Sequence, residues 1–153
     1  MEIKYLANCP EYIEQVVNWI YGEFVVKGKN PCDIGKVNEH FSHTNTNSFP
    51  ITLVALVNDQ CVGTVSLFEN DLKNQKVLTP WLASLYVDVP YRSKGIAKKL
   101  IEQVKEIAKK MGFKVLYLRT EHTARYYRDL GWTYHEKTID EKGQETEIFK
   151  IEL

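Results

Sequence analysis

The segment YRSKGIAKKL, from Tyr91 to Leu100, is the most informative stretch of this sequence. It follows an apolar, strand-like run and leads into a strongly amphipathic helix, with two cations, a serine and a glycine in between. The first amides of a helix have no intrahelical acceptor, and the helix dipole places partial positive charge there. Gly95 has no Cβ, so the backbone can approach a phosphate closely at this turn. The segment therefore predicts an anion site, although a basic helix entry with an ordinary glycine explains it equally well.

The amino-acid composition limits which anionic ligands such a site can bind. The chain has 153 residues, 44% of them apolar and 12% aromatic, which is enough for a packed globular core. Acidic and basic residues balance at 20 each, whereas general polyanion binders usually carry a basic excess. The segment also contains neither a Walker loop nor a dinucleotide fingerprint. We therefore expect local recognition of a phosphate group and no nucleic-acid partner.

The beginning of the sequence and its cysteines give no sign of export or membrane insertion. MEIKYLANCPEY has no apolar run behind a basic start, and no stretch approaches the roughly 20 apolar residues that a membrane helix needs. Cys9, Cys32 and Cys61 are an odd number and are widely spaced. We therefore expect a cytoplasmic protein without disulfides and without a membrane partner.

Hydrophobic spacing divides the chain into elements in the order β-α-α-β-β-β-α-β-α-β-β. The predicted strands cover residues 1–6, 51–57, 61–68, 79–89, 114–120, 132–139 and 146–153. The predicted helices cover residues 10–24, 31–43, 94–111 and 124–130. The 94–111 helix has the clearest pattern, and Gly112 stands where its left-handed C-cap belongs. We expect one α+β domain over residues 1–153, with helices packed on the faces of a mixed sheet.

A second motif, ARYYRDLGW, lies one strand downstream of the glycine loop. Thr123 can cap its short helix and Gly131 can end it. Two adjacent tyrosines differ by about 100° around a helix, so Tyr126 and Tyr127 cannot both face the core. One of them should face a cleft or solvent, where a phenol can act as a general acid.

Together, LYVDVPYRSKGIAKKLI and LYLRTEHTARYYRDLGW resemble the GNAT superfamily of acetyl-CoA-dependent N-acetyltransferases. Three residues match the family's R/Q-x-x-G-x-G/A loop, namely Arg92, Gly95 and Ala97. Five match its A-x-(F/Y)-Y-x-x-x-G-(F/W) signature, namely Ala124, Tyr126, Tyr127, Gly131 and Trp132. The resemblance covers nearly the whole chain and implies a GNAT fold, with a mostly antiparallel sheet of about seven strands and about four helices.

The resemblance also implies that acetyl-CoA is the co-substrate and that no metal is needed. In this family the strand before the loop splays from the next parallel strand, often at a bulge, and the pantetheine arm bonds to its free backbone groups. Here those groups would belong to Leu85, Tyr86 and Val87, with an N–H near Tyr86 that stabilises the developing oxyanion. The pyrophosphate would lie on the loop and first helical turn, made of Arg92, Ser93, Lys94, Gly95, Ile96, Ala97 and Lys98.

The implied reaction is direct attack of a neutral amine on the thioester. Tyr127 matches the family's general acid, placed to protonate the departing thiolate, and a packing role is the alternative for this residue. The general base stays open, because many relatives carry a glutamate near the position of Ser84. Glu69 is our candidate, Glu121 or His122 are others, and deprotonation through ordered water is equally plausible.

Family acceptors usually enter between the first two helices, the strand before the loop and the final hairpin. Aromatic side chains hold cations and flat apolar groups well at such sites. Trp81 is the best candidate because it follows Pro80 at the opening of a strand. Phe24, Glu23 and Ser84 complete the predicted substrate-binding set, and a solvated helix end explains Glu23 equally well.

Other reactive residues predict little further chemistry. Cys61 lacks an evident partner base, so it is a poor candidate nucleophile. His40 and His43 would need Glu39 or Cys32 to hold a metal, and a surface role explains them better. The apolar alternation of TEIFKIEL is compatible with a homodimer, because many relatives pair through their C-terminal strands.

The sequence thus predicts an enzyme that transfers an acetyl group from acetyl-CoA to a primary amine. The acceptor would be a small molecule, such as an aminoglycoside, a polyamine or an amino acid, or a peptide amine. The alternative is a non-catalytic acyl-CoA-binding regulatory module on the same fold, because a fold does not fix a function.

Overall fold

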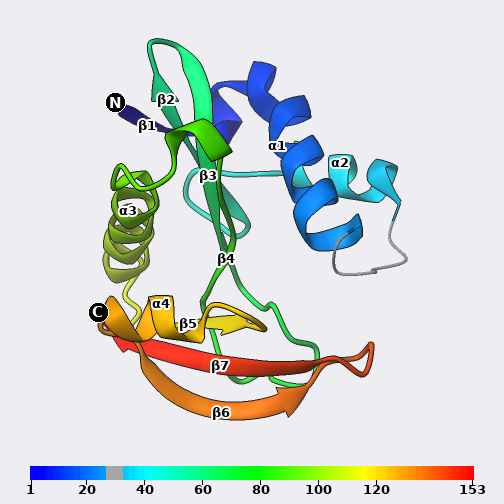
Figure 1. Cartoon of the computed structure of the whole chain (residues 1–153), viewed down its shortest axis with the longest axis vertical. Helices are drawn as coiled ribbons and strands as arrows, with labels where there is room; N and C mark the ends of the chain where they lie inside the picture. Colours follow the sequence, from blue (N-terminus) through cyan, green and yellow to red (C-terminus); the bar gives the residue numbers. More distant parts are fainter. Residues whose placement is uncertain (27–32) are drawn as a thin grey trace. The chain divides into compact units, whose positions relative to one another are not determined.

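The computed structural model describes residues 1–26 and 33–153, and within them a mixed sheet of seven strands with four α-helices (Figure 1). The strands are β1 Glu2–Tyr5, β2 Ile51–Val57, β3 Gln60–Phe68, β4 Trp81–Val87, β5 Val115–Thr120, β6 Thr133–Ile139 and β7 Glu145–Glu152. The helices are α1 Ile13–Ile20, α2 Ile34–Ser42, α3 Ile96–Lys110 and α4 Ala124–Asp129. The strand order is β1-β2-β3-β4-β5-β7-β6, with a parallel β4–β5 pair and antiparallel pairs at β1–β2, β5–β7 and β6–β7. The predicted α+β class with a mixed sheet is confirmed.

The chain forms two compact units that alternate along the sequence. Unit 1 contains residues 1–66 and 84–102, and unit 2 contains residues 67–83 and 103–153. The chain passes from one unit to the other within β3, β4 and α3. Three central elements of the fold therefore contribute residues to both units.

Unit 1 is built on a β-hairpin and two helices. The turn between β2 and β3 places Asn58 and Asp59 at φ +50° and +62°, a conformation that these two residue types tolerate well. The predicted helix over residues 10–24 begins as a 3-10 turn at Pro10–Tyr12, continues as α1 and ends as a π-helical turn at Tyr21–Val26. The apolar stripe of α1 packs into a core with parts of β2, β3 and α2.

Gly63 on β3 permits a close approach of three elements in unit 1. A Cβ at this position would lie 3.2 Å from the Tyr86 carbonyl oxygen on β4. It would also lie 3.3 Å from Leu100 Cδ1 and 3.4 Å from Ile96 Cγ2 on α3. The end of β4 is further held by a 2.8 Å hydrogen bond from the Asp88 N–H to the Val62 carbonyl. The missing side chain at Gly63 thus lets the first turn of α3 sit directly on the sheet.

Unit 2 contains the second half of the sheet and α4. Residues along β5 alternate between buried and half-exposed, and β7 pairs with it from Val115↔Glu152 to Thr120↔Glu147. The β6–β7 pair has a register shift between Tyr134 and Glu136, which leaves His135 as the extra residue. Gly131 ends α4 at φ +94°, and the Trp132 N–H bonds back to the Tyr127 carbonyl at 3.0 Å.

Some element boundaries differ from the prediction. The strand expected over residues 79–89 covers only Trp81–Val87, and the helix expected from residue 94 begins at Ile96. Thr123 precedes α4 as predicted, but its side chain makes no capping bond to the helix. Instead its N–H and its hydroxyl both bond to Thr120 Oγ1, at 3.0 Å and 2.6 Å. Among the described residues, no helix combines the length and apolarity needed to cross a bilayer.

The packing at Gly63 predicts a cost for any side chain there. We expect Gly63→Val to destabilise the protein by about 1–3 kcal/mol, because the Tyr86 carbonyl belongs to the sheet backbone and cannot move aside. Gly22→Ala is the control, since a Cβ at Gly22 meets no atom within 4 Å. Thermal melting should show a lower Tm for Gly63→Val alone. Equal Tm values for the two variants would contradict the packing described for α3.

Candidate functional site

The turn between β4 and α3 presents backbone amides to solvent. Ser93 and Gly95 adopt φ +62° and +83°, and both are exposed. A Cβ built on Gly95 meets no atom within 4 Å, so the space in front of this residue is open. The first helical bond runs from the Lys99 N–H to the Gly95 carbonyl. The amides of the three preceding residues therefore have no acceptor within the helix and suit an anion.

Arg92 is held at this turn by the β4 backbone and an aromatic ring. Its Nε donates to the Val87 carbonyl at 2.8 Å, and its guanidinium carbon lies 5.3 Å from the centroid of the Tyr86 ring. The Trp19 ring, on α1, packs against the same tyrosine at 5.2 Å. Within the described residues the two terminal guanidinium nitrogens make no hydrogen bond or ion pair, so they can bind an anion.

The backbone of β4 has a local irregularity of the kind expected from the family resemblance. Ser84 adopts φ +54° in the middle of the strand, which is unusual for a residue with a Cβ. β4 pairs in parallel with β5 at Trp81↔Tyr117. Leu85 and Tyr86 are half-exposed and Val87 is buried. These are the residues whose backbone groups we expect to meet the pantetheine arm.

Tyr127 is the buried member of the adjacent tyrosine pair. It is 9% exposed, whereas Tyr126 is 41% exposed. The Tyr127 ring packs edge-on against Tyr126 at 5.2 Å and against Trp132 at 6.0 Å. Its hydroxyl makes no hydrogen bond with any described residue. Burial, and secondarily Tyr126, raises the pKa of Tyr127 above its ordinary value, which keeps the proton on the oxygen.

The three side chains predicted as candidate bases lie in unit 2, in different surroundings. Glu69 is exposed, and its main-chain carbonyl accepts a 2.7 Å bond from Thr79 Oγ1. Glu121 follows β5, where its Oε2 accepts from Thr146 Oγ1 at 2.7 Å and lies 3.6 Å from Arg119 Nε. His122 is exposed. Of these three, only Glu121 has its carboxylate fixed by neighbours.

Asp71 is a titratable group that the sequence analysis did not single out. It lies in the connection between β3 and β4, and burial raises the pKa of its carboxyl to about 7, against the opposing effect of Arg119. Glu121 and Glu141 raise the same pKa further. Nothing in the local sequence NDLKNQ distinguishes this aspartate from a surface residue, because its burial depends on segments far along the chain.

The predicted substrate-binding residues do not all behave as expected. Trp81 is fully buried against Leu72 and Ile148, and its Nε1 donates to the Leu78 carbonyl at 2.7 Å. Its ring is therefore part of the core of unit 2 and does not fit the acceptor-facing role that we predicted. Phe24 is 44% exposed on the π-helical turn after α1, and Glu23 precedes it, half-exposed.

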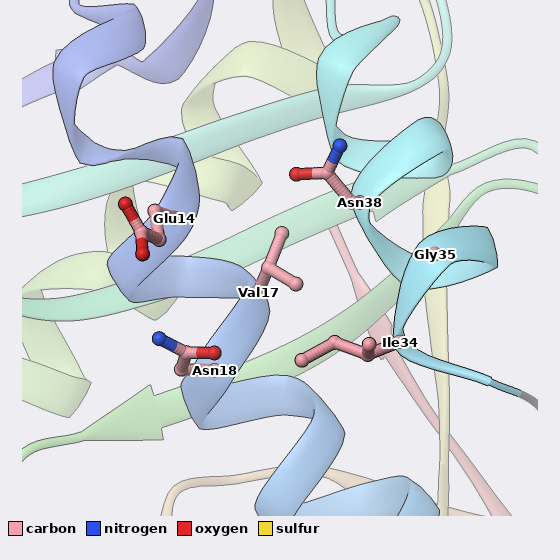
Figure 2. Close-up of a pocket in the computed structure, with 6 residues that line it drawn as sticks. All are labelled: Glu14, Val17, Asn18, Ile34, Gly35 and Asn38. Atoms are coloured by element: carbon pink, nitrogen blue, oxygen red, sulfur yellow. The ribbon is translucent and has the colours of Figure 1, made fainter.

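A pocket of about 430 Å³ lies between α1 and α2 in unit 1. Figure 2 shows Val17 and Ile34 pointing into the gap between the two helices, with polar side chains around them. The lining consists of Glu14, Val17, Asn18, Ile34, Gly35 and Asn38. One carboxylate, two amides and two aliphatic side chains suit a small polar molecule with an amine.

The remaining reactive side chains fit structural roles. Burial raises the pKa of the Cys61 thiol to about 12, so at neutral pH it is not the thiolate that a nucleophile requires. Cys9 is also buried and donates to the Tyr5 carbonyl at 3.2 Å. In the part of the chain that the structure describes, no three His, Cys, Asp or Glu side chains gather as metal ligands. Cys32, named above as a conceivable partner of His40 and His43, lies outside that part.

Comparison with known families and structures gives one consistent result. A family model described as the acetyltransferase (GNAT) family matches residues 13–132. No curated protein matches the chain in sequence. Three similar solved structures are an aminoglycoside 6'-N-acetyltransferase complexed with coenzyme A, a GNAT-family acetyltransferase from Staphylococcus aureus Mu50, and a ribosomal-protein-alanine N-acetyltransferase from Brucella melitensis.

These structures are similar to the chain over almost its whole length. The aminoglycoside enzyme has a TM-score of 0.74 at 17% identity, with 99% of this chain and 97% of that one covered. The Staphylococcus protein has a TM-score of 0.74 at 21% identity, with 99% of each chain covered. The Brucella protein has a TM-score of 0.72 at 17% identity, with both chains fully covered. At such identities the likeness concerns the fold.

The environment of Asp71 predicts a specific dependence of stability on pH. Its pKa is about 7 in the folded protein against an ordinary 3.8. Between these two values the folded state keeps a proton that the unfolded chain has lost, so stability falls as pH rises. Asp71→Asn removes this loss. We therefore expect the Tm of the variant to exceed the wild-type Tm by several degrees above pH 7, with the gap closing as pH falls toward 4.

The exposed Asp129 gives the matched control for this stability measurement. Asp129→Asn makes the same charge change in the same unit, and it should leave the pH dependence of the wild type intact. Thermal melting across this pH range checks both variants. A gap between Asp71→Asn and wild type that does not vary with pH would mean that the carboxyl of Asp71 titrates normally.

Proposed function

We propose that this chain, which belongs to the acetyltransferase (GNAT) family, transfers an acetyl group from acetyl-CoA to a primary amine. The observation that carries the proposal is the turn before α3, with its outward amides and the free guanidinium edge of Arg92. The chemistry of this turn matches a diphosphate, the anionic part of coenzyme A. Coenzyme A is present in the similar aminoglycoside acetyltransferase structure, and acetyl coenzyme A in that of an acetyltransferase from Bacillus anthracis.

The backbone amides and basic side chains around the turn suit the phosphate groups of the co-substrate. Ile96, Ala97 and Lys98 would supply the first helical amides, and Ser93 and Lys94 the loop that leads to them. The side chains of Lys94 and Lys98 are exposed and can reach phosphate oxygens. The side chain of Ile96 is buried at 7% exposure, so this residue would contribute through its backbone alone. The site therefore combines fixed amides with mobile cations.

Bound acetyl-CoA would supply the thioester, and the chain's own groups would direct its cleavage. The acceptor nitrogen attacks the thioester carbon, the carbon–sulfur bond breaks, and the acceptor loses one proton. An N–H near Tyr86 would stabilise the negative charge on the thioester oxygen. Tyr127 would give its proton to the departing sulfur, since a phenol is protonated at neutral pH. Burial, which raises the pKa of Tyr127, makes it a weaker acid, so the negative charge on the sulfur must supply the driving force.

The proposed acceptor is an amine, and the residues beside the first two helices bear on its class. Phe24, Glu23 and Ser84 stay in our proposed acceptor set, whereas the buried ring of Trp81 leaves it. Family acceptors enter beside the first two helices, and the α1–α2 pocket offers one carboxylate there. The names of the similar structures cover both small molecules and a protein terminus, so we propose a small-molecule or peptide amine. We keep Glu69 as one candidate base.

The alternative function is a regulatory module that binds acyl-CoA without turning it over. The two functions differ in one observable, the release of free thiol when an amine is present. Retention of the Tyr127 phenol favours the enzyme. Thiol release from acetyl-CoA with a panel of primary amines therefore tests the proposal, and binding of coenzyme A without any release would favour the module.

The turn before α3 predicts that a methyl group at Gly95 weakens cofactor binding. We expect Gly95→Ala to raise the Kd of coenzyme A by about tenfold, since the strain at φ +83° turns at least one amide away from the phosphates. Gly143→Ala is the matched control, because Gly143 also has positive φ, +80°, and also faces open space. Calorimetric titration measures both. Unchanged affinity in Gly95→Ala would show that this turn does not bind coenzyme A.

The position of Tyr127 predicts a loss of turnover without a loss of cofactor binding. We expect Tyr127→Phe to lower kcat by about a hundredfold or more, the usual contribution of a general acid, while KM for acetyl-CoA stays nearly constant. Tyr126→Phe is the control on the same helix. Because the pKa of Tyr127 is raised, the wild-type rate should show no decline from its deprotonation up to about pH 9. A Tyr127→Phe enzyme with full kcat would show that Tyr127 has only a packing role.

A further inference from the structure

The helix that carries Tyr127 is too short to hold its own position. α4 has six residues, and isolated helices of this length are marginal in water. Its two adjacent tyrosines carry the same phenol group, yet Tyr127 is 9% exposed and Tyr126 is 41% exposed. Neighbouring residues differ by about 100° around a helix, so a rotation of α4 by that angle would exchange the two phenols. The rotation of α4 must therefore be fixed by contacts with the rest of unit 2.

At its N-terminal end, α4 is tied to β5 by the hydroxyl of Thr120. This Oγ1 accepts a 3.0 Å hydrogen bond from the Thr123 N–H and shares a second hydrogen bond with Thr123 Oγ1 at 2.6 Å. Thr123 is the residue before the helix, and its carbonyl accepts a 3.4 Å bond from the Tyr127 N–H. The Thr120 hydroxyl is thus joined to the backbone of Tyr127 through a single residue.

Thr120 is itself anchored in the sheet. It is the last residue of β5, is 7% exposed, and pairs with Glu147 on β7. Its carbonyl lies 3.5 Å from Thr146 Oγ1, which donates to Glu121 Oε2 at 2.7 Å. Buried polar side chains normally meet specific partners, and for the Thr120 hydroxyl that partner is the residue before α4. The start of α4 is therefore held by a group that belongs to the sheet.

Contacts at the C-terminal end of α4 discriminate less well between the two tyrosines. The Trp132 N–H bonds to the Tyr127 carbonyl at 3.0 Å, and the two rings pack edge-on at 6.0 Å. The guanidinium carbon of Arg128 lies 5.3 Å from the centroid of the Phe149 ring on β7. Ring contacts tolerate changes of angle, and the phenol of Tyr126 would pack against Trp132 in a similar way. Hydrogen bonds are directional, so those at Thr120 are the contacts that select one rotation.

We propose that Thr120 is a positioning residue for acetyl transfer: its hydroxyl, acting through Thr123, sets the rotation of α4 so that Tyr127 is turned inward. The inference deepens the proposed function, because it rests on Tyr127 as the acid. The Thr120 hydroxyl need not touch either reactant. It keeps the phenol within hydrogen-bond reach of the sulfur, since a catalytic group displaced by about 1 Å loses much of its effect.

NMR of the full chain tests the position of α4 without turnover. Thr120→Val removes the hydroxyl and keeps the shape of the side chain, whereas Thr120→Ser keeps the hydroxyl. We expect the Trp132 amide to exchange its hydrogen about tenfold faster in Thr120→Val alone, because only this variant loses the bonds to Thr123. NOEs between the Tyr127 and Trp132 rings should weaken in the same variant. The Tyr117 amide on β5, which bonds to the Pro80 carbonyl, is the internal reference and should not change.

Kinetics separate positioning from a general loss of stability. We expect Thr120→Val to lower kcat about tenfold with little change in KM for acetyl-CoA, and Thr120→Ser to keep most of the wild-type kcat. In a Tyr127→Phe background, Thr120→Val should lower kcat no further, because Thr120 acts through the phenol. Thr64→Val is the matched control: its buried hydroxyl donates to the Leu53 carbonyl at 2.8 Å in unit 1. This variant loses a buried bond of the same kind and should keep wild-type exchange at Trp132.

Three results would overturn the role of Thr120: equal exchange at Trp132 in Thr120→Val and Thr120→Ser, equal acceleration at Trp132 and Tyr117, or the same fold-loss of kcat with and without the Tyr127 phenol. The two proposals can fail separately. If no amine releases thiol, the acetyl transfer is lost and the NMR measurements decide on Thr120. Full kcat in Tyr127→Phe would refute the acid and its positioning together, while acetyl transfer itself would stand.

Discussion

The unsatisfied amides at the start of α3 are the constraint around which unit 1 is arranged. A helix of this length leaves its first N–H groups without acceptors, and such groups are costly unless water or a ligand meets them. Here the preceding turn at Ser93 and Gly95 keeps the space in front of them open. Gly63 lets the first turn of the helix sit directly on β3 and β4, which fixes the direction of the amides. Packing on one side of the helix thus holds a binding surface on the other.

Burial has different chemical consequences at three residues, depending on the charge of their ionised form and on what surrounds them. In Tyr127 it raises the pKa of a phenol, which keeps the proton on the oxygen and weakens the group as an acid. In Cys61 the same effect makes a thiol inert, because the nucleophilic form is the thiolate. In Asp71 it brings the pKa near neutrality, where a bound charge can shift the balance between the two forms. A buried position therefore supports function only where a charge or a hydrogen-bond partner remains within reach.

The sequence predicted those features that depend on local chemistry. The spacing of apolar residues located all seven strands and all four helices, and Gly112 and Gly131 both end helices at positive φ as their positions suggested. Long-range packing accounts for what was missed. Trp81 follows a proline that suggested an open strand end, but its neighbours Leu72 and Ile148 come from distant segments and enclose it. Asp71 sits in an unremarkable polar loop, and its pKa is raised by burial under segments far along the chain, against the opposing effect of Arg119.

The zero net charge of the chain suits a reaction between two reactants of different charge. Acetyl transfer from acetyl-CoA to an amine brings together an anionic co-substrate and an acceptor that is cationic in neutral solution until it loses a proton. A strongly basic chain would attract the first and repel the second, and an acidic chain would do the reverse. This sequence carries 20 charges of each sign and no net charge. It places Arg92, Lys94 and Lys98 at the proposed phosphate turn. Since screening in physiological salt acts over about 8 Å, this basic turn can attract an anion locally while the overall field favours neither reactant.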